Sequence, residues 1–376
     1  MHCAAKGVVE VWPRDEYTPW QWNQWNLAAT RSVYMRHPGL AEVATGLAVD
    51  VHAHHVSRDL LKVDRRFTSH RDSTWGESLH FENRYLGPLI PRLTDLSLSL
   101  QDMDQGAISH RLCCSASWLT CYWAEPELGR YIARAINESL ADAVGKHKDR
   151  LAALATLPLQ DVDGSVEELR YAYHRLGIRG ASAGTNVNGV YFDDPRFEPL
   201  FDALEELDMP LFLHPDEVAG QDRLKDYWLV RLIGNPHEAT ISLSRMILGG
   251  VLERHPKLKV CFPMGGGSVT QLLGRINHGW SVRPEARVHA PRPPAEYLRN
   301  CFFDTILHSD LSLRFLLEVV PPEQVVLGSD YPWDMGQANA RAFVENSGIS
   351  EKDRQLVLSA NVSRLINTEF GMAVTN

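Results

Sequence analysis

The sequence predicts an α/β protein whose eight parallel strands close into a barrel, a (β/α)8 TIM-type fold. Short apolar runs alternate with amphipathic stretches from residue 47 onward, and eight such units fit into the chain. Repeated strand–helix units indicate a parallel sheet with crossover helices, and eight strands are the number that closes a barrel. Histidine or aspartate follows several of the apolar runs, at the strand ends where barrels of this kind carry functional residues.

Each unit can be placed along the chain from its pattern. Apolar residues spaced i, i+3, i+4 and i+7 predict a helix through Phe197 and Leu204, and Val166, Leu169 and Tyr173 share one face in the preceding unit. The apolar stretch 246–252 predicts another helix, which continues until His-Pro at 255–256 stops it. The expected strands are 47–54, 108–115, 151–157, 178–184, 210–214, 258–263, 300–307 and 324–329.

Two segments depart from this alternation. Residues 1–45 form an N-terminal extension with four tryptophans and little periodicity, which we expect to pack on the barrel or on a neighbouring subunit. Residues 46–376 then form the barrel domain. The long connection 55–107, after the first strand, is expected to be an inserted lid. Its Arg84 and Arg92 could meet an anionic substrate or remain solvated.

Composition excludes several classes of function. Lys and Arg number 38 against 47 Asp and Glu, and a net charge of −9 gives no general affinity for nucleic acid or acidic membranes. No apolar run approaches the roughly 20 residues that span a bilayer, and the N-terminus lacks the apolar core of a signal peptide. The six cysteines form neither a disulfide framework nor a Cys-x-x-Cys metal motif. We therefore expect a cytoplasmic protein without nucleic-acid or membrane partners.

Four side chains at strand ends predict a metal site. His52 and His54 lie one residue apart on the first strand, so their side chains point to the same face. His214 ends the fifth strand, and Asp330 follows the eighth. The alternatives are core or surface histidines and an aspartate that caps the next helix. Because imidazole is the commonest protein ligand for zinc and related ions, three strand ends with this chemistry favour a metal.

The same stretches carry a family resemblance. The motif Asp-Val-His-Ala-His at 50–54 and Leu-Gly-Ser-Asp-Tyr-Pro at 327–332 are accompanied by matches at 155–161, 184–189, 193–197, 213–215, 249–258 and 274–279. In these stretches the chain resembles the amidohydrolase superfamily, and within it the branch of 2-amino-3-carboxymuconate-6-semialdehyde decarboxylase. The resemblance implies a (β/α)8 barrel that binds one divalent metal, usually Zn²⁺, through His52, His54, His214 and Asp330.

The resemblance also bears on metal count and assembly. Two-metal members need a bridging group on strand four, often a carboxylated lysine, and residues 178–184 contain no lysine or acid. One metal is therefore expected. Arg275 matches a family arginine that reaches the substrate carboxylate in the neighbouring subunit's site, which implies a homodimer. A guanidinium suits bidentate carboxylate binding; the alternative for Arg275 is an ion pair on the helix surface.

Strand six departs from the family pattern. The family places a catalytic histidine, which activates water at the metal, immediately before a glycine run; here Met264 precedes the glycines at 265–267. A thioether cannot transfer a proton. General acid–base catalysis typically raises a reaction rate by about 10²- to 10⁴-fold, so the loss of this histidine should lower the rate. Three explanations are open: another histidine takes over the role, the reaction needs no such base, or the site has lost catalysis. His55, His237 and His308 are the possible substitutes, and His308, after strand seven, is the first choice.

The first hypothesis is a metal-dependent decarboxylase of a carboxylated aromatic or aromatic-derived small molecule. Asp330 would bind the metal and relay a proton, Arg275 would hold the substrate carboxylate, and Met264 and Trp333 would line the substrate pocket. The alternative is a hydrolysis or a cyclising dehydration of an ortho-aminophenol-type compound. A barrel without the water-activating histidine suits a reaction in which water is not the nucleophile. A catalytically silent binding protein is a third possibility, against which the complete ligand set argues.

Overall fold

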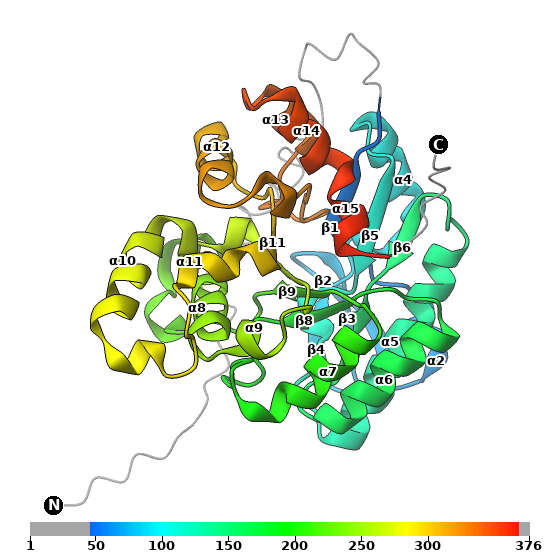
Figure 1. Ribbon diagram of the computed structural model, residues 1–376. Coiled ribbons are helices and arrows are strands. Elements are labelled where there is room, and N and C mark those ends of the chain that lie inside the picture. The colour runs from blue at the N-terminus through cyan, green and yellow to red at the C-terminus, as the bar shows by residue number, and fades with distance from the viewer. Residues whose placement is uncertain (1–45, 368–376) are drawn as a thin grey trace, which may run out of the picture.

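A computed structural model describes residues 46–367 and shows the predicted barrel (Figure 1). The N-terminal extension and its tryptophans lie outside the described residues, so their packing stays a prediction. The barrel strands, in chain order, are β1 (Val49–His54), β5 (His110–Cys114), β6 (Leu151–Ala153) with β7 (Ala155–Thr156), β8 (Ala181–Gly184), β9 (Leu211–His214), β10 (Val260–Phe262), β11 (Cys301–Asp304) and β12 (Val325–Val326).

The strands pair in parallel and in sequence order. One sheet runs β1-β5-β6 and the other β7-β8-β9-β10-β11-β12. Only Leu154 separates β6 from β7, so the two form one strand shared by both sheets. The barrel closes where Val51 N donates to Leu327 O at 2.8 Å and where Ala53 pairs with Tyr331. All eight predicted strands are thus confirmed, with several shorter than expected.

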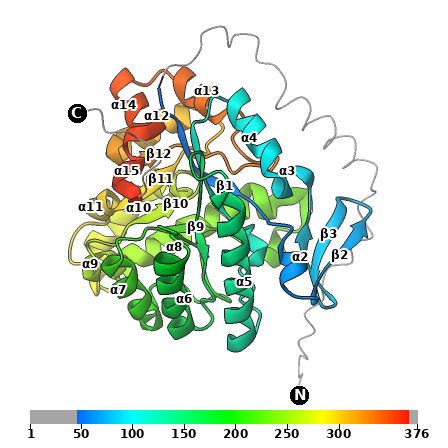
Figure 2. The same ribbon diagram turned by 90° about the vertical axis from the view of Figure 1, so that its right-hand side faces the viewer.

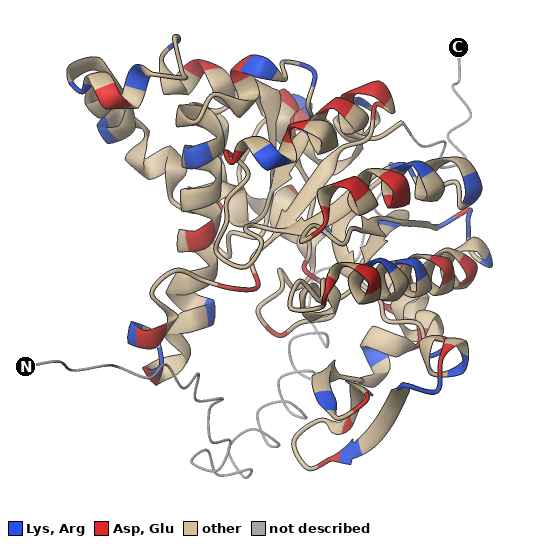
Figure 3. Ribbon diagram, turned by 90° about the horizontal axis from the view of Figure 1, so that it is seen from below, with Lys and Arg blue, Asp and Glu red and all other residues tan. Residues whose placement is uncertain are grey.

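Helices surround the strands on the outside (Figures 1 and 2). The four residues of one predicted helix face, Phe197, Leu200, Phe201 and Leu204, are buried; Phe197 immediately precedes α7 (Glu198–Glu206), and the other three lie on it. After the insertion, the helices are α5 (Pro126–Gly145), α6 (Val162–Arg175), α7 (Glu198–Glu206), α8 (Asn235–Leu248), α9 (Val251–Arg254), α10 (Val269–Val282), α11 (Pro294–Tyr297), α12 (Asp310–Val319), α13 (Ala340–Asn346), α14 (Glu351–Gln355) and α15 (Val362–Leu365). Acidic and basic residues alternate along the outer helices (Figure 3).

One predicted helix is broken. The stretch 246–252 was expected to continue as a single helix, and that prediction is wrong, because α8 ends at Leu248 and α9 begins at Val251. Gly250 between them has a φ of 76°, in the left-handed region that glycine adopts readily. A Cβ at this position would also lie 2.4 Å from His289 O. The chain therefore turns here on a residue that no larger side chain can replace without strain.

The insertion after β1 folds against the side of the barrel (Figure 2). It comprises α2 (Leu60–Val63), an antiparallel sheet of β2 (Phe67–Asp72), β3 (Gly76–Phe81) and β4 (Arg84–Pro88), and α3 (Pro91–Thr94). Its buried Phe67, Leu79 and Phe81 belong to a hydrophobic cluster distinct from the main core. The next helix, α4 (Leu96–Gln105), buries Met103 in the main core and so belongs to the barrel. Whether the insertion acts as a lid stays a prediction.

The two arginines singled out in the insertion, Arg84 and Arg92, have different environments. Arg92 Nε donates to Asp102 Oδ2 at 2.7 Å, so this guanidinium is already paired and is not free for a substrate. Arg84 is exposed and stacks over the Trp123 ring at 4.0 Å.

Within residues 46–367, no helix is both long and apolar enough to cross a membrane. The five described cysteines are free thiols.

His55 gives the fold a pH dependence. It follows β1, is only 4% exposed, and lies beside Leu93 near the start of α4. Burial lowers its pKa from 6.5 to about 4. Between these values the unfolded chain binds a proton that the folded chain does not, so stability falls as the pH drops from about 6.5 to about 4. By this linkage, the loss reaches up to about 3 kcal/mol.

We expect His55→Gln to flatten this part of the stability profile, because the amide cannot titrate. Urea unfolding of metal-stripped protein across this pH range measures the effect. His237→Gln, which removes an exposed histidine, is the matched control and should leave the slope unchanged. A His55→Gln profile parallel to that of the parent protein would contradict the prediction.

Candidate metal centre

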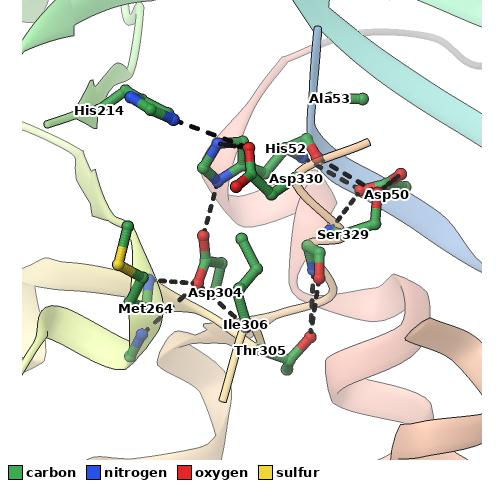
Figure 4. A network of polar contacts seen from close by, with 12 residues as sticks. Asp50, His52, Ala53, His214, Met264, Asp304, Thr305, Ile306, Ser329 and Asp330 are labelled. Atoms are coloured by element: carbon green, nitrogen blue, oxygen red, sulfur yellow. Dashed lines mark hydrogen bonds and ion pairs between the residues drawn. The ribbon is translucent and has the colours of Figure 1, made fainter. Parts of the chain in front are cut away.

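Three histidines and one aspartate converge at the carboxyl ends of the barrel strands. His52 and His54 come from β1, His214 ends β9, and Asp330 follows β12. Figure 4 shows His52, His214 and Asp330 side by side. Their potential ligand atoms all lie within 4.8 Å of one another. Asp330 Oδ1 is 2.9 Å from His54 Nε2, 3.5 Å from His52 Nε2 and 3.7 Å from His214 Nε2. The structure therefore brings together all four predicted ligands.

Pairing between β1 and the segment after β12 places the aspartate. Asp330 N donates to His52 O at 2.8 Å, and His54 N donates to Tyr331 O at 2.7 Å. Asp330 itself has a φ of 58°, a left-handed conformation that costs a non-glycine residue about 1–3 kcal/mol. The surrounding hydrogen bonds hold the residue in this conformation, which turns its carboxylate toward the imidazoles.

Each histidine uses its Nδ1 for a second contact. His52 Nδ1 lies 2.8 Å from Asp304 Oδ2, His54 Nδ1 lies 3.1 Å from Ser115 O, and His214 Nδ1 lies 2.8 Å from Pro215 O. Because all three partners are acceptors, each Nδ1 carries the proton and each Nε2 presents its lone pair. Histidines that bind metals characteristically donate their other N–H to a carboxylate or carbonyl in this way.

The donor set fits a divalent metal. His214 Nε2 is buried and has no hydrogen-bond partner in the described part of the chain. Burial lowers the pKa of His214, which favours the neutral imidazole that a metal ligand requires. Burial alone would raise the pKa of Asp330, but the neighbouring imidazoles hold it well below its usual range. Three nitrogens and one carboxylate oxygen suit a borderline cation such as Zn²⁺.

The described residues offer one such cluster. Among residues 46–367, no second group of three or more potential ligands gathers in the same way. Strand β8, Ala181–Gly184, contains no lysine or acid that could bridge two ions. The site therefore supports a single divalent metal.

Asp304 is the site residue that the sequence analysis missed. It ends β11, is 1% exposed, and contacts His52 through Oδ2. Its Oδ1 accepts from Met264 N at 2.6 Å and from Ile306 N at 3.2 Å (Figure 4). Asp304 thus joins the turn after β10 to the histidine on β1. Its place on a predicted strand, 300–307, was a sequence signal of the same kind as those of the four ligands, and His308 lies four residues later.

The candidate catalytic and substrate residues are dispersed. The Trp333 ring lies 6.0 Å from the His54 ring and is half-buried. Met264 is also half-buried and has a φ of 55°. His308 is exposed and lies outside the cluster, with its backbone N–H bound to Gln337 Oε1. Arg275 is exposed on α10, with no ion pair to any residue between 46 and 367.

Comparison with known proteins gives the family context. The sequence pattern of the amidohydrolase family matches residues 122–367. A 2-amino-3-carboxymuconate-6-semialdehyde decarboxylase from Dictyostelium discoideum is 30% identical over 332 residues, which cover 86% of this chain and 92% of that protein. A gamma-resorcylate decarboxylase from Rhodococcus jostii is 29% identical over 304 residues, covering 76% and 92%.

Solved structures share the barrel fold. The 5-carboxyvanillate decarboxylase from Sphingomonas paucimobilis superposes with a TM-score of 0.74 at 24% identity, covering 86% of this chain and 99% of that one. A dihydroxybenzoic acid decarboxylase from Polaromonas, crystallised with manganese and 2-nitroresorcinol, gives 0.72 at 20% identity, covering 85% and 97%. At these identities the likeness confirms the predicted fold.

The geometry predicts one equivalent of divalent metal per chain and a supporting role for Asp304. We expect His214→Ala to abolish tight binding, because it removes a ligand. Asp304→Ala should raise the metal Kd by about 10- to 100-fold, because it releases the ring orientation of His52. Elemental analysis gives the stoichiometry, and competition with a chromophoric chelator gives the affinity.

Glu198→Ala is the matched control, since Glu198 Oε2 holds His255 Nε2 at 2.8 Å in a carboxylate–imidazole pair outside the metal cluster. Its metal affinity should equal that of the parent protein. Two equivalents of metal, or an unchanged affinity in Asp304→Ala, would contradict the assignment.

Proposed function

This chain belongs to the amidohydrolase family, and on that basis we propose that it is a metal-dependent decarboxylase of a carboxylated aromatic or aromatic-derived small molecule. The observation that carries the proposal is the buried set of His52, His54, His214 and Asp330 at the mouth of the barrel. The curated relatives named above decarboxylate 2-amino-3-carboxymuconate-6-semialdehyde and gamma-resorcylate, as their names state. A small-molecule carboxylate is therefore the expected substrate.

We propose Zn²⁺ as the resident ion. Three imidazoles and one carboxylate are a ligand set that zinc accepts, with room for a further ligand. Manganese is the competing candidate, because it occupies the Polaromonas structure. The free cysteines support a reducing compartment, and we propose a cytoplasmic location.

In decarboxylation the bond from a substrate carbon to the carboxylate carbon breaks, carbon dioxide leaves, and the electron pair left on the substrate carbon takes up a proton. When bound, the metal would supply Lewis-acid polarisation of a substrate oxygen. We assign the proton relay to Asp330, whose Oδ1 faces the three Nε2 atoms. Trp333 offers an aromatic face beside His54, and Met264 offers an apolar wall.

Met264 supports a second candidate function. Its thioether is a weak acceptor and cannot donate a proton, so the site lacks the acid–base group that the family resemblance places before the glycine run. A cyclising dehydration of an ortho-aminophenol-type compound, or a hydrolysis, uses the same Lewis-acid site with different proton transfers. Decarboxylation releases carbon dioxide, a cyclising dehydration releases water, and a hydrolysis consumes water.

We also propose a homodimer in which Arg275 serves the partner's site. Helix α10 buries only Val269 and Thr270, although it has 14 residues and exposes Leu272 and Val282 at its surface. The helix lies at the outer edge of the molecule (Figure 1). A second copy would cover this apolar face, and Arg275 on the same helix would then be available to bind a substrate carboxylate across the interface.

Carbon dioxide release tests the reaction. We expect metal-dependent release from 2-amino-3-carboxymuconate-6-semialdehyde at well below the ordinary enzymatic range of roughly 1 to 10³ per second, because Met264 cannot transfer a proton. Met264→His should keep the metal content, since Met264 is not a ligand, and Met264→Leu is the control for side-chain bulk. A rate in the ordinary range would show that another group has replaced the histidine.

The same assay on gamma-resorcylate widens the substrate test. If neither compound releases carbon dioxide and the protein instead closes the ring of an ortho-aminophenol in a metal-dependent reaction, the second candidate function is the correct one. Release that persists after the metal is removed would contradict both functions.

Substrate affinity and subunit mixing test Arg275. Arg275→Lys keeps the charge but loses the planar fork, so KM should rise, by about 10-fold or more in Arg275→Ala. Co-expression of Arg275→Ala with His214→Ala should restore activity, because one site in the mixed dimer has both its metal ligands and the partner's arginine. Arg196→Ala, a change to an exposed arginine on another element, is the control. Unchanged kinetics in Arg275→Ala, or an active monomer, would remove this role.

A further inference from the structure

A second buried carboxylate lies directly behind the metal ligands. Asp50 is on β1, two residues before His52, and is fully buried. It is not one of the clustered ligands. Its two oxygens accept hydrogen bonds from Arg111 Nε at 2.9 Å, Ser329 N at 3.0 Å and Ser329 Oγ at 2.6 Å. Asp50 therefore holds the residue that immediately precedes the ligand Asp330 (Figure 4).

Arg111 completes this arrangement from the neighbouring strand. It lies on β5, opposite Asp50 in the strand register, and is 4% exposed. Besides its bond to Asp50, it donates from Nη1 to Ser99 Oγ at 2.8 Å. Its guanidinium lies 4.1 Å from the centre of the Tyr331 ring, within the range of a cation–π contact. Arg111 thus touches the residue after Asp330 and, through Asp50, the residue before it.

The segment between these two contacts needs such support. Asp330 is held in a left-handed conformation that its backbone would leave if it were free. Ser329 and Tyr331 are the residues whose positions fix that conformation, and Ser329 Oγ also accepts from Tyr331 N at 3.2 Å. Two backbone hydrogen bonds to β1 fix the same segment. The side chains of Asp50, on the same strand, and of Arg111, on β5, add contacts to the residues on either side of Asp330.

We propose that Arg111 is a positioning residue for the metal ligand Asp330, acting through the shared carboxylate of Asp50 and the ring of Tyr331. The residue fixes the backbone conformation in which the Asp330 carboxylate faces the three imidazoles. This inference rests on the proposed metal site but not on the reaction catalysed there. Its prediction is a change in the affinity of the stripped protein for a metal ion, which can be measured without any substrate.

A purely structural role makes a different prediction. A buried arginine can stabilise the barrel without influencing the metal, and Arg341 provides such a case. Arg341 is also 4% exposed, and it donates from Nη1 to Ala107 O at 2.9 Å and to Gly46 O at 3.2 Å, before β5 and β1 begin. It therefore joins the same two strands from the end opposite the ligands. The comparison of the two arginines separates stability from positioning.

The experiment measures Zn²⁺ affinity on chelator-stripped full-length protein by competition with a chromophoric chelator, and thermal unfolding of the same samples. Removal of groups that support a metal ligand typically weakens affinity by about 10- to 100-fold. We expect Arg111→Met to raise the Zn²⁺ Kd by about 10-fold, at the lower end of that range, because it acts through Asp50. Arg111→Lys should recover part of the affinity, since it restores the charge. Arg341→Met should lower the unfolding temperature but leave the Kd within about twofold.

Ser329→Ala keeps the test decisive if Arg111→Met does not fold. It removes only the hydroxyl that binds Asp50 Oδ2, and we expect it to raise the Zn²⁺ Kd severalfold. Parent affinity in both Ser329→Ala and a folded Arg111 variant would overturn the proposal. An equal loss of affinity in Arg341→Met would also overturn it, by showing that any strand destabilisation weakens the site. Failure to release carbon dioxide would bear on the proposed reaction and leave this result standing.

Discussion

The pairing of β1 with the segment that follows β12 is the constraint on which both the barrel and the metal centre depend. Val51 N bonds Leu327 O to close the barrel, and the next contacts along the same edge are Asp330 N with His52 O and His54 N with Tyr331 O. The closure that removes the sheet edges therefore also sets Asp330 against the two histidines of β1. A shift of one residue in this pairing would turn the ligands away from one another, because strand side chains alternate between faces.

Most of the correct predictions, of the barrel strands and of the metal ligands, came from patterns within short stretches of sequence. Strand alternation and helical spacing located the eight strands, and strand ends located the four ligands, because both signals lie within a few residues of sequence. The missing information concerned partners that are distant along the chain. Asp304 meets His52 across 252 positions, and no local pattern records that contact. The sequence could not decide whether Arg92 binds substrate or is solvated. Its contact with Asp102 forms only because α3 folds against α4.

The buried ion pair of Asp50 and Arg111 positions the segment that carries Asp330 more than it stabilises the fold. Transferring an ion pair such as Asp50 and Arg111 from water costs several kcal/mol per ion, which its own attraction offsets only when the remaining donors are also satisfied. Here Asp50 accepts from both the backbone N–H and the hydroxyl of Ser329, and Arg111 also donates to Ser99 Oγ. An apolar pair would fill the same space, but it would not fix the direction of the segment that carries Asp330.

In the turn at Met264, the backbone and the side chain have different roles. Its backbone N–H binds Asp304 Oδ1 while Asp304 Oδ2 holds His52, so the main chain of the turn supports the metal ligands whatever side chain it carries. The side chain is free to vary independently, and here it offers a thioether where proton transfer would need an imidazole. We therefore expect a substitution at this position to keep the metal ligands in place and to change only the groups available for proton transfer beside them. If Asp330 relays the proton as proposed above, a substrate of such a site would either exchange its proton with that carboxylate or carry a mobile proton of its own.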